Sequence, residues 1–311
     1  MEQGDVTTRA IRSRGLVLQV QSRASPSPRT APVLVVRAAA EGEATIRPQA
    51  KALLPVADIV GVRIAGVSGP GTLPPHCGLD DLADGLAAVV DELGLPRVHV
   101  LGTSHGGEIA YRFAVRHPDR IDHLVLTGAN GHRPHLPPDT SLAALATRAR
   151  SSARHEVVDE IISSVLCLDP RRSVRGRATM HWALNDLFNG ADNSHINQWI
   201  RCLQMLCEAP QPTGLSAALL VVTGEHDIAI RPTDSRALAA MSSQAVFATL
   251  QEADHWVFLT RTREHLDLTR RFLLDEPLEH LPYLAALERF PHPGLGRPTT
   301  PVPVGANPQA G

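Results

Sequence analysis

Val98-His-Val-Leu-Gly-Thr-Ser-His-Gly-Gly107 is the stretch that decides the fold. It begins with an apolar run typical of a buried strand, passes through a glycine-flanked turn, and leads into a helix. At its centre, Gly102-Thr-Ser104-His-Gly106 matches the pattern G-x-S-x-G. In such a turn the serine stands above the sheet edge on a strained backbone with positive φ. The glycines are needed because strand and helix pass too closely for side chains.

The residues after the turn support this prediction, because the motif alone also occurs in turns with an incidental serine. Apolar residues recur at helical spacing at positions 109, 110, 113 and 114. We expect the helix to end at His117, since a residue before proline avoids the α region. The order strand, elbow, helix is the context in which a nucleophilic serine is found.

Strands and helices alternate along most of the chain. Apolar strands are expected at 33–36, 58–64, 98–101, 121–127, 217–223 and 246–250, and a hairpin within 6–21. Helices are expected at 79–93 and 261–274, a helix end at 51–56, and a further short helix within 276–290. This alternation predicts an α/β fold with a mostly parallel central sheet.

The pattern changes between residues 131 and 213, where helical segments near 141–150, 154–166, 173–188 and 194–208 follow without a strand. We therefore predict a core made of residues 1–130 and 214–290, with 131–213 forming a helical cap over the carboxyl edge of the sheet. The Pro/Gly-rich tail, 291–311, is expected to be disordered.

Composition limits the classes of protein to consider. The 311 residues are 43% hydrophobic and 20% charged, as in ordinary globular proteins, and the net charge of −2 argues against a nucleic-acid partner. No apolar run is long enough to span a bilayer, and the first residues lack the features of a signal peptide. The four cysteines show no metal-binding spacing and fit a reducing compartment. We expect a cytoplasmic protein without metal or cofactor, and the sequence leaves its oligomeric state open.

Three residues suited to nucleophilic catalysis follow predicted strands. Ser104 follows the strand at 98–101, Asp227 the strand at 217–223, and His255 the strand at 246–250. Carboxyl ends of parallel strands meet at one edge, so these side chains are expected to converge. A serine hydroxyl needs a base, and the base needs a carboxylate that fixes its tautomer. Glu225 is an alternative carboxylate, and only its position before the last core helix singles out His255 among 15 histidines.

Residues from about 32 to 290 resemble the α/β-hydrolase superfamily, in its serine-nucleophile branch with a helical lid. The resemblance rests on the elbow and on four further stretches: Leu79-Asp-Asp-Leu-Ala-Asp84, His117-Pro-Asp-Arg-Ile-Asp-His-Leu-Val-Leu126, Val221-Val-Thr-Gly-Glu-His-Asp227 and Ala253-Asp-His255. It implies a catalytic triad in the chain order Ser104, Asp227, His255.

The resemblance also implies an oxyanion hole, made by the backbone N–H groups of His105 and of Ala38 or Ala39. Members of the superfamily usually carry His-Gly after the strand equivalent to 33–36, whereas this chain reads Arg37-Ala-Ala-Ala40. Any residue except proline can donate a backbone N–H, so a donor is still available there. The missing glycine leaves the geometry of this loop open.

Other side chains have plainer expected roles. Arg37 is expected to be solvated, with binding of a substrate carboxylate as the alternative. The His105 side chain is expected on the surface or in a pocket wall, and His181 and His195 on the cap helices away from catalysis. Five apolar cap residues are expected to form the cap core, with an acyl pocket as the alternative: Trp182, Phe188, Trp199, Met205 and Leu206.

Together these features predict a serine hydrolase that cleaves an ester or thioester of a small or acyl-chain substrate. Two alternatives stay open. An alcohol or amine instead of water could intercept the same acyl-enzyme, which would make the protein an acyltransferase. Alternatively, the altered loop after residue 36 fits a non-catalytic ligand-binding relative.

Overall fold

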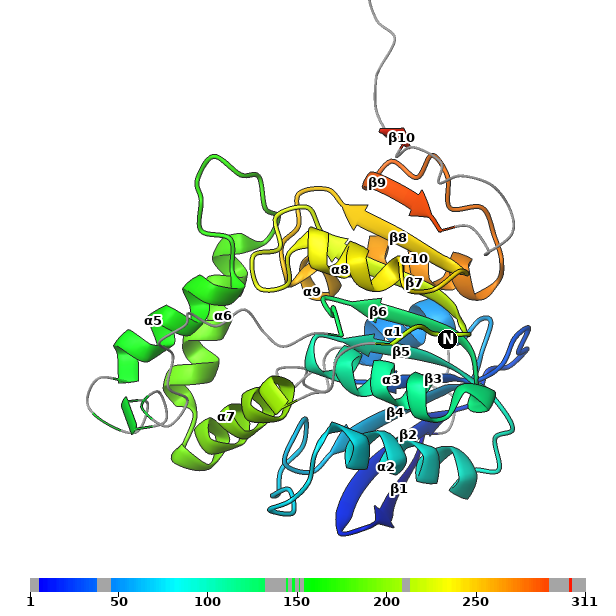
Figure 1. Cartoon of the computed structure of the whole chain (residues 1–311), viewed down its shortest axis with the longest axis horizontal. Helices are drawn as coiled ribbons and strands as arrows, with labels where there is room; N and C mark the ends of the chain where they lie inside the picture. Colours follow the sequence, from blue (N-terminus) through cyan, green and yellow to red (C-terminus); the bar gives the residue numbers. More distant parts are fainter. Residues whose placement is uncertain are drawn as a thin grey trace, which may run out of the picture.

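The computed structural model shows a wound sheet with helices on both faces and further helices to one side (Figure 1). It describes residues 6–37, 46–131, 144, 147–148, 151, 154–208, 213–290 and 302–303. Ala38 and Ala39 lie outside the described residues, as do most of the predicted helix near 141–150 and most of the tail.

The strands form one sheet in the order β1-β2-β4-β3-β5-β6-β7-β8-β9-β10. Their bounds are Val6–Ser13 (β1), Leu16–Arg23 (β2), Val33–Val36 (β3), Ile59–Ile64 (β4), Val98–Thr103 (β5), Ile121–Thr127 (β6), Ala218–Gly224 (β7), Ala245–Leu250 (β8), Leu284–Arg289 (β9) and Val302–Pro303 (β10). Strands β4, β3, β5, β6, β7 and β8 run parallel, and the two outer strands on each side pair antiparallel. Strands β3, β5 and β8 are buried throughout, as expected where helices cover both faces. The predicted fold class is confirmed.

Helices cover the two faces of the sheet and bury separate apolar clusters. On one face lie α2 (Leu79–Glu92), α3 (His105–Arg116) and α8 (Pro232–Ala239). On the other lie α1 (Ile46–Leu53), α9 (Val257–Thr260) and α10 (Thr262–Leu273). A short 3₁₀ helix, η2 (Pro118–Arg120), joins α3 to β6. Because α3 follows β5 directly, residue 104 lies at the point where the strand becomes the helix.

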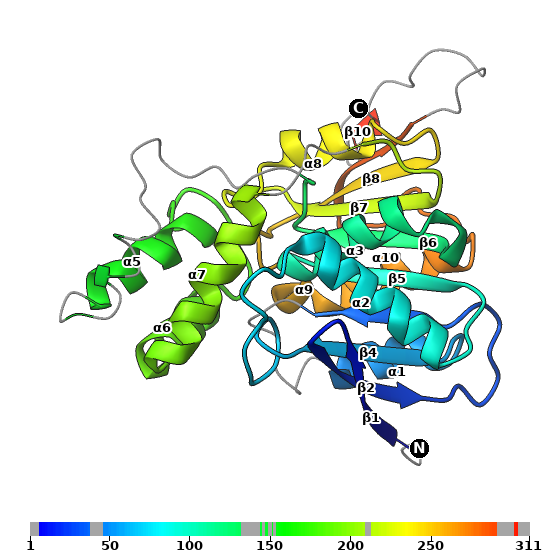
Figure 2. The ribbon, with the colours of Figure 1, turned by 60° about the horizontal axis from the view of Figure 1, so that its bottom comes forward.

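The remaining helices are α5 (Arg154–Val165), α6 (Arg177–Gly190) and α7 (Asn193–Glu208). They lie together beside the sheet in two views (Figures 1 and 2). The Gln198 side chain of α7 donates a 3.0 Å hydrogen bond to the carbonyl of Val67, in the loop after β4. The backbone N–H of Arg175 donates to the carbonyl of Glu252, just after β8, at 2.9 Å. These helices therefore contact loops at the carboxyl ends of the parallel strands, while the division into core and cap remains a prediction.

The packing of these helices corrects one expectation. Trp182 is 69% exposed and is not a core residue. Helix α6 buries Met180 and Leu184, which are four residues apart, and Trp182 lies between them on the opposite side of the helix. Phe188 and Trp199 do pack against each other, with ring centroids 5.8 Å apart. Met205 is buried, and Leu206 packs against the core cluster of α2 and α3.

The expected helix within 276–290 is wrong, because this segment ends in strand β9. Asp275 and His280 have positive φ values of 53° and 63°, which a helix does not allow. Strand β9 then pairs antiparallel with β8 and buries Leu284. The open edge of β8 therefore overrides the helical propensity of the local sequence. Of the tail, the structure describes only Val302–Pro303, which pair with β9, so disorder there stays a prediction.

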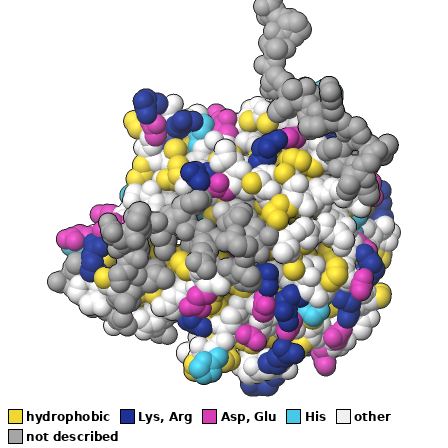
Figure 3. Space-filling view, in the orientation of Figure 1, with side chains coloured by type: hydrophobic (Ala, Val, Ile, Leu, Met, Phe, Trp, Pro, Cys, Tyr) yellow, Lys and Arg dark blue, Asp and Glu magenta, His cyan; other side chains and the backbone are white. Residues whose placement is uncertain are grey.

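Charged side chains of both signs are interspersed on the face shown in Figure 3, in keeping with the small net charge. Within the described ranges, no helix has the length and apolar character needed to cross a membrane. The four cysteines carry free thiols.

Candidate active site

Ser104 occupies the elbow between β5 and α3. Its φ of 48° and ψ of −125° confirm the predicted strained backbone. A methyl group at Gly106 would lie 2.4 Å from the Val36 carbonyl oxygen, and one at Gly102 would lie 2.7 Å from the Ala110 side chain. Strand and helix therefore approach each other so closely that both flanking positions require glycine.

The structure brings Ser104, His255 and Asp227 together. The Ser104 Oγ lies 3.0 Å from Nε2 of His255, and Nδ1 of the same ring lies 3.2 Å from Oδ2 of Asp227. The neutral tautomer with its proton on Nδ1 satisfies both bonds: Nδ1–H donates to Asp227, and the Ser104 hydroxyl donates to Nε2. The second Asp227 oxygen accepts the backbone N–H of Ile230 at 2.8 Å, which fixes the carboxylate.

Burial and charge act in opposite directions on His255. Burial by itself lowers the pKa of the imidazole, because it disfavours the charged ring. The charge and hydrogen bond of Asp227, with a further contribution from the charge of Asp254, outweigh burial and raise the pKa. The site therefore stabilises a protonated His255, the form that a general base takes after accepting the hydroxyl proton.

The alternative carboxylate has another role. Glu225 accepts the backbone N–H of Glu252 at 2.6 Å and lies 3.4 Å from the ring of His226. It joins the loops after β7 and β8 and has no hydrogen bond to His255. Of the two, Asp227 is the carboxylate that is hydrogen-bonded to the imidazole.

The residue after the serine is buried. His105 is 7% exposed, so a place on the surface is wrong while a place in a pocket wall stays a prediction. Burial lowers the pKa of its ring to about 4. Neither ring nitrogen has a hydrogen-bond partner within the described residues. Its backbone N–H belongs to the first residue of α3, at the positive end of the helix dipole.

The side of the site formed by the loop after β3 is only partly described. Ala38 and Ala39 lie outside the described residues, so their role as oxyanion donors stays a prediction. Arg37 is 1% exposed, and its expected solvation is wrong. The backbone of Arg37 lies under Gly106, while its guanidinium extends over Gly61 of β4, where the absence of a side chain leaves room for it.

The sequence did not single out two buried carboxylates near the site. Glu108, one helical turn beyond Ser104, accepts the backbone N–H groups of Asn130 and Gly131 at 2.9 and 3.3 Å. Asp254 directly precedes His255 and is completely buried. The four-residue spacing from Ser104 to Glu108 is a signal that a helical wheel would have revealed, whereas nothing local distinguishes Asp254 from a solvated loop residue.

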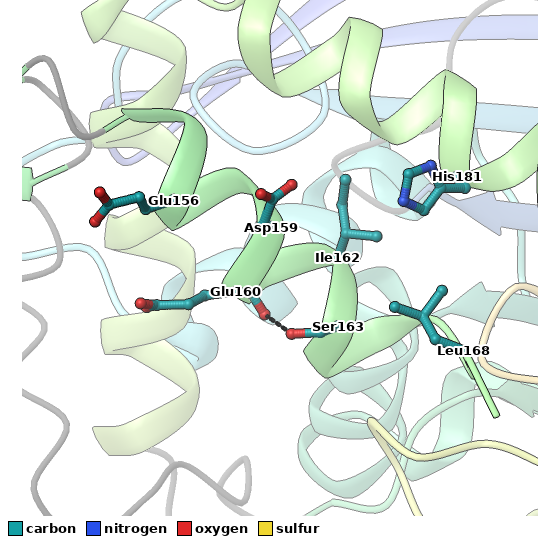
Figure 4. A pocket seen from close by; sticks show the side chains of 7 residues that line it. All are labelled: Glu156, Asp159, Glu160, Ile162, Ser163, Leu168 and His181. Carbon is teal, nitrogen blue, oxygen red and sulfur yellow. Dashed lines mark hydrogen bonds between the residues drawn. The ribbon is translucent and has the colours of Figure 1, made fainter.

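A groove of about 380 Å³ lies away from this site, between α5 and α6 (Figure 4). It is lined by Glu156, Asp159, Glu160, Ile162, Ser163, Leu168 and His181. His181 and His195 lie on α6 and α7, and both are exposed, as expected for residues outside the catalytic group. Within the described residues, no group of His, Cys, Asp and Glu side chains is arranged to hold a metal ion.

Comparison with known proteins gives relatives that match either over a short stretch or at low identity. A putative carbamate hydrolase of Caulobacter vibrioides, RutD, is 40% identical over 65 residues, which are 21% of this chain and 24% of that protein. This match thus spans about a quarter of the relative's length. The poly(3-hydroxyalkanoate) depolymerase of Ectopseudomonas oleovorans is 24% identical over 261 residues, 80% of this chain and 86% of the depolymerase.

The fold comparison covers more of the chain. The enol-lactonase from Burkholderia xenovorans LB400 has a TM-score of 0.70 and 20% sequence identity, covering 86% of this chain and 100% of the lactonase. At this identity the likeness shows the fold alone. Residues 49–262 match the family described as alpha/beta hydrolase fold. Since this match spans more than half of the residues, the chain belongs to the alpha/beta hydrolase fold family.

Proposed function

We propose that this protein is a serine hydrolase that cleaves an ester or thioester bond of a small or acyl-chain substrate through an acyl-enzyme. The observation that carries the proposal is the unbroken line of hydrogen bonds from Ser104 through His255 to Asp227. Such a line activates a hydroxyl that is otherwise a poor nucleophile at neutral pH.

The proposed reaction has two stages, acylation of Ser104 and hydrolysis of the acyl-enzyme. His255 Nε2 takes the hydroxyl proton as Ser104 Oγ attacks the substrate carbonyl carbon, and Asp227 stabilises the resulting imidazolium. The N–H groups of His105 and of Ala38 or Ala39 hold the oxyanion. His255 then gives its proton to the leaving alcohol or thiol, which departs and leaves the acyl group on Ser104. Water, deprotonated by His255, attacks the acyl-enzyme, releases the acid and restores the serine.

The relatives support reaction at a carbonyl carbon. The matched proteins include, by name, a carbamate hydrolase and a poly(3-hydroxyalkanoate) depolymerase, and the bond that each cleaves joins an acyl carbon to oxygen or nitrogen. Both are hydrolases, whereas a matched homoserine O-acetyltransferase of Thermus thermophilus, 36% identical over 75 residues, is named for acyl transfer, so water and other acceptors must both be tested. Screening p-nitrophenyl esters of increasing chain length beside acyl-thioesters, with and without added alcohols, will identify the preferred leaving group and acceptor.

A fluorophosphonate probe tests the proposal directly, because it reacts much faster with an activated serine hydroxyl than with an ordinary one. We expect stoichiometric labelling of the wild type and none of Ser104→Ala. Ser235→Ala is a matched control, since Ser235 is also buried but donates its hydroxyl hydrogen bond to the Ala129 carbonyl. If the wild type is not labelled, or if Ser104→Ala is still labelled, the proposal fails and the non-catalytic alternative gains support.

A further inference from the structure

The carboxylate of Asp254 lies at the centre of a contact between the His255 loop and the segment after α5. It is 0% exposed, and each of its oxygens accepts a backbone N–H. Oδ1 accepts the N–H of Trp256 at 3.1 Å, and Oδ2 accepts the N–H of Cys167 at 3.0 Å. A buried carboxylate bound by two N–H donors holds both donor segments in place, because either donor would otherwise lose its partner.

The two bonds hold different parts of the chain. Trp256 follows His255 directly, so residues on both sides of the imidazole belong to one hydrogen-bonded turn. Cys167 lies two residues beyond α5, in the predicted cap. The backbone of Asp254 also lies against the end of β7, where a methyl group on Gly224 would come within 2.4 Å of the Asp254 carbonyl oxygen. The turn therefore has little freedom to shift relative to Asp227.

Charge also links Asp254 to His255, because nearby carboxylates favour the protonated imidazole. The carboxylates that influence the protonation of His255 are Asp227, which is hydrogen-bonded to it, and Asp254, which acts through its charge alone. Burial, together with the charge of Asp227, raises the pKa of Asp254 above its ordinary value, and the two backbone bonds and the charge of His255 offset only part of this rise. Asp254 is a second carboxylate beside the base, with its hydrogen bonds directed away from the imidazole.

We propose that Asp254 is a positioning residue for His255, holding the imidazole in line with Ser104, supporting its positive charge, and fixing the segment after α5 to the same turn. This inference rests on the proposed serine hydrolase function and adds a residue to it. Within the described residues the Asp254 carboxylate bonds to the backbone of Trp256 and Cys167 and not to Ser104, so its action is through His255.

The test measures the rate of fluorophosphonate labelling as a function of pH in the full-length protein. Asp254→Asn keeps the size of the side chain but removes the charge and one of the two acceptors. We expect labelling at the alkaline plateau to fall about tenfold to a hundredfold, since small misplacements of a catalytic group have effects of this size. We also expect the midpoint of the acid limb to move down by about one pH unit, because a negative charge near the imidazolium is lost.

Three further variants separate this role from a structural one. Asp254→Glu keeps the charge, so the midpoint of its acid limb should stay at the wild-type pH. Asp254→Ser is a second neutral variant, and the midpoint of its acid limb should move to lower pH. Asp58→Asn is the matched control, because Asp58 accepts the N–H of Ser25 at 2.7 Å near the amino end of β4, far along the sheet from His255. We expect it to lower stability without moving the acid limb.

The outcomes also separate this inference from the proposed function. Absence of labelling in the wild type would reject the serine hydrolase itself. Labelling of the wild type that depends on Ser104, combined with an unchanged acid limb in folded Asp254→Asn and Asp254→Ser, would overturn the positioning role alone.

Discussion

Replacing the buried carboxylic acid Glu108 by its neutral amide should stabilise the protein at neutral pH. Glu108 is 7% exposed, and the backbone N–H groups of Asn130 and Gly131 donate to one of its oxygens. Burial raises its pKa from 4.5 to about 7, in spite of these two bonds. Glu108→Gln keeps a carbonyl oxygen to accept them and removes the charge that burial disfavours.

The sign and size of the effect follow from proton binding. The folded protein holds the Glu108 proton more tightly than the unfolded chain does, so stability falls as the pH rises from about 4.5 and levels off above about 7. Since one pKa unit is worth about 1.4 kcal/mol, the full penalty is about 3 kcal/mol. Glu108→Gln avoids this penalty, so its advantage over the wild type should be about 3 kcal/mol at pH 8 and absent at pH 4.5.

Urea denaturation at several pH values between 4.5 and 8.5 measures this difference. Glu92→Gln, at the exposed end of α2, is the control and should change the free energy of unfolding little at any pH. Equal stabilities of Glu108→Gln and the wild type at pH 8, or a constant loss at every pH, would refute the reasoning. A constant loss would mean that the amide fits the site less well than either form of the carboxyl group, through its bonds to residues 130 and 131.

Three other predictions concern the elbow, the base and the contact at residue 213. In a pH profile of kcat/KM, the midpoint of the acid limb should lie above pH 6.5, because the raised pKa of His255 leaves the base protonated at lower pH. A midpoint below pH 6.5 would contradict this. Gly106→Ala should abolish probe labelling and destabilise the fold by about 3 kcal/mol or more. Gly190→Ala should be tolerated, because an added methyl group there would meet no described atom within 4 Å outside its own helical turn. Tyr111→Phe should lower the free energy of unfolding, measured by urea denaturation, by about 1–3 kcal/mol. The Tyr111 hydroxyl donates to the Thr213 carbonyl and accepts the Thr213 N–H, and the variant loses both bonds. Unchanged stability would show that these bonds contribute nothing.

Periodicity and turn chemistry in the sequence were enough to predict the elbow, the parallel strands and the residues at their carboxyl ends. These features are local: alternating apolar residues, glycines two positions from a serine, and an aspartate and a histidine directly after strands. Once the strands are parallel, their carboxyl ends lie at one edge, and Ser104, Asp227 and His255 must end near one another. Their approach to within hydrogen-bond distance agrees with this reasoning.

The remaining features depended on partners distant in the sequence. β9 forms because β8 offers an open edge, and Arg37 is buried because α3 and β4 enclose it. The role of Asp254 likewise depends on Cys167, 87 residues away. A local sequence pattern shows which side chains are apolar or charged. Their burial and hydrogen bonding depend on the residues that pack against them in the folded protein. For these residues the opposing group comes from another segment, so only the tertiary structure decided their environment.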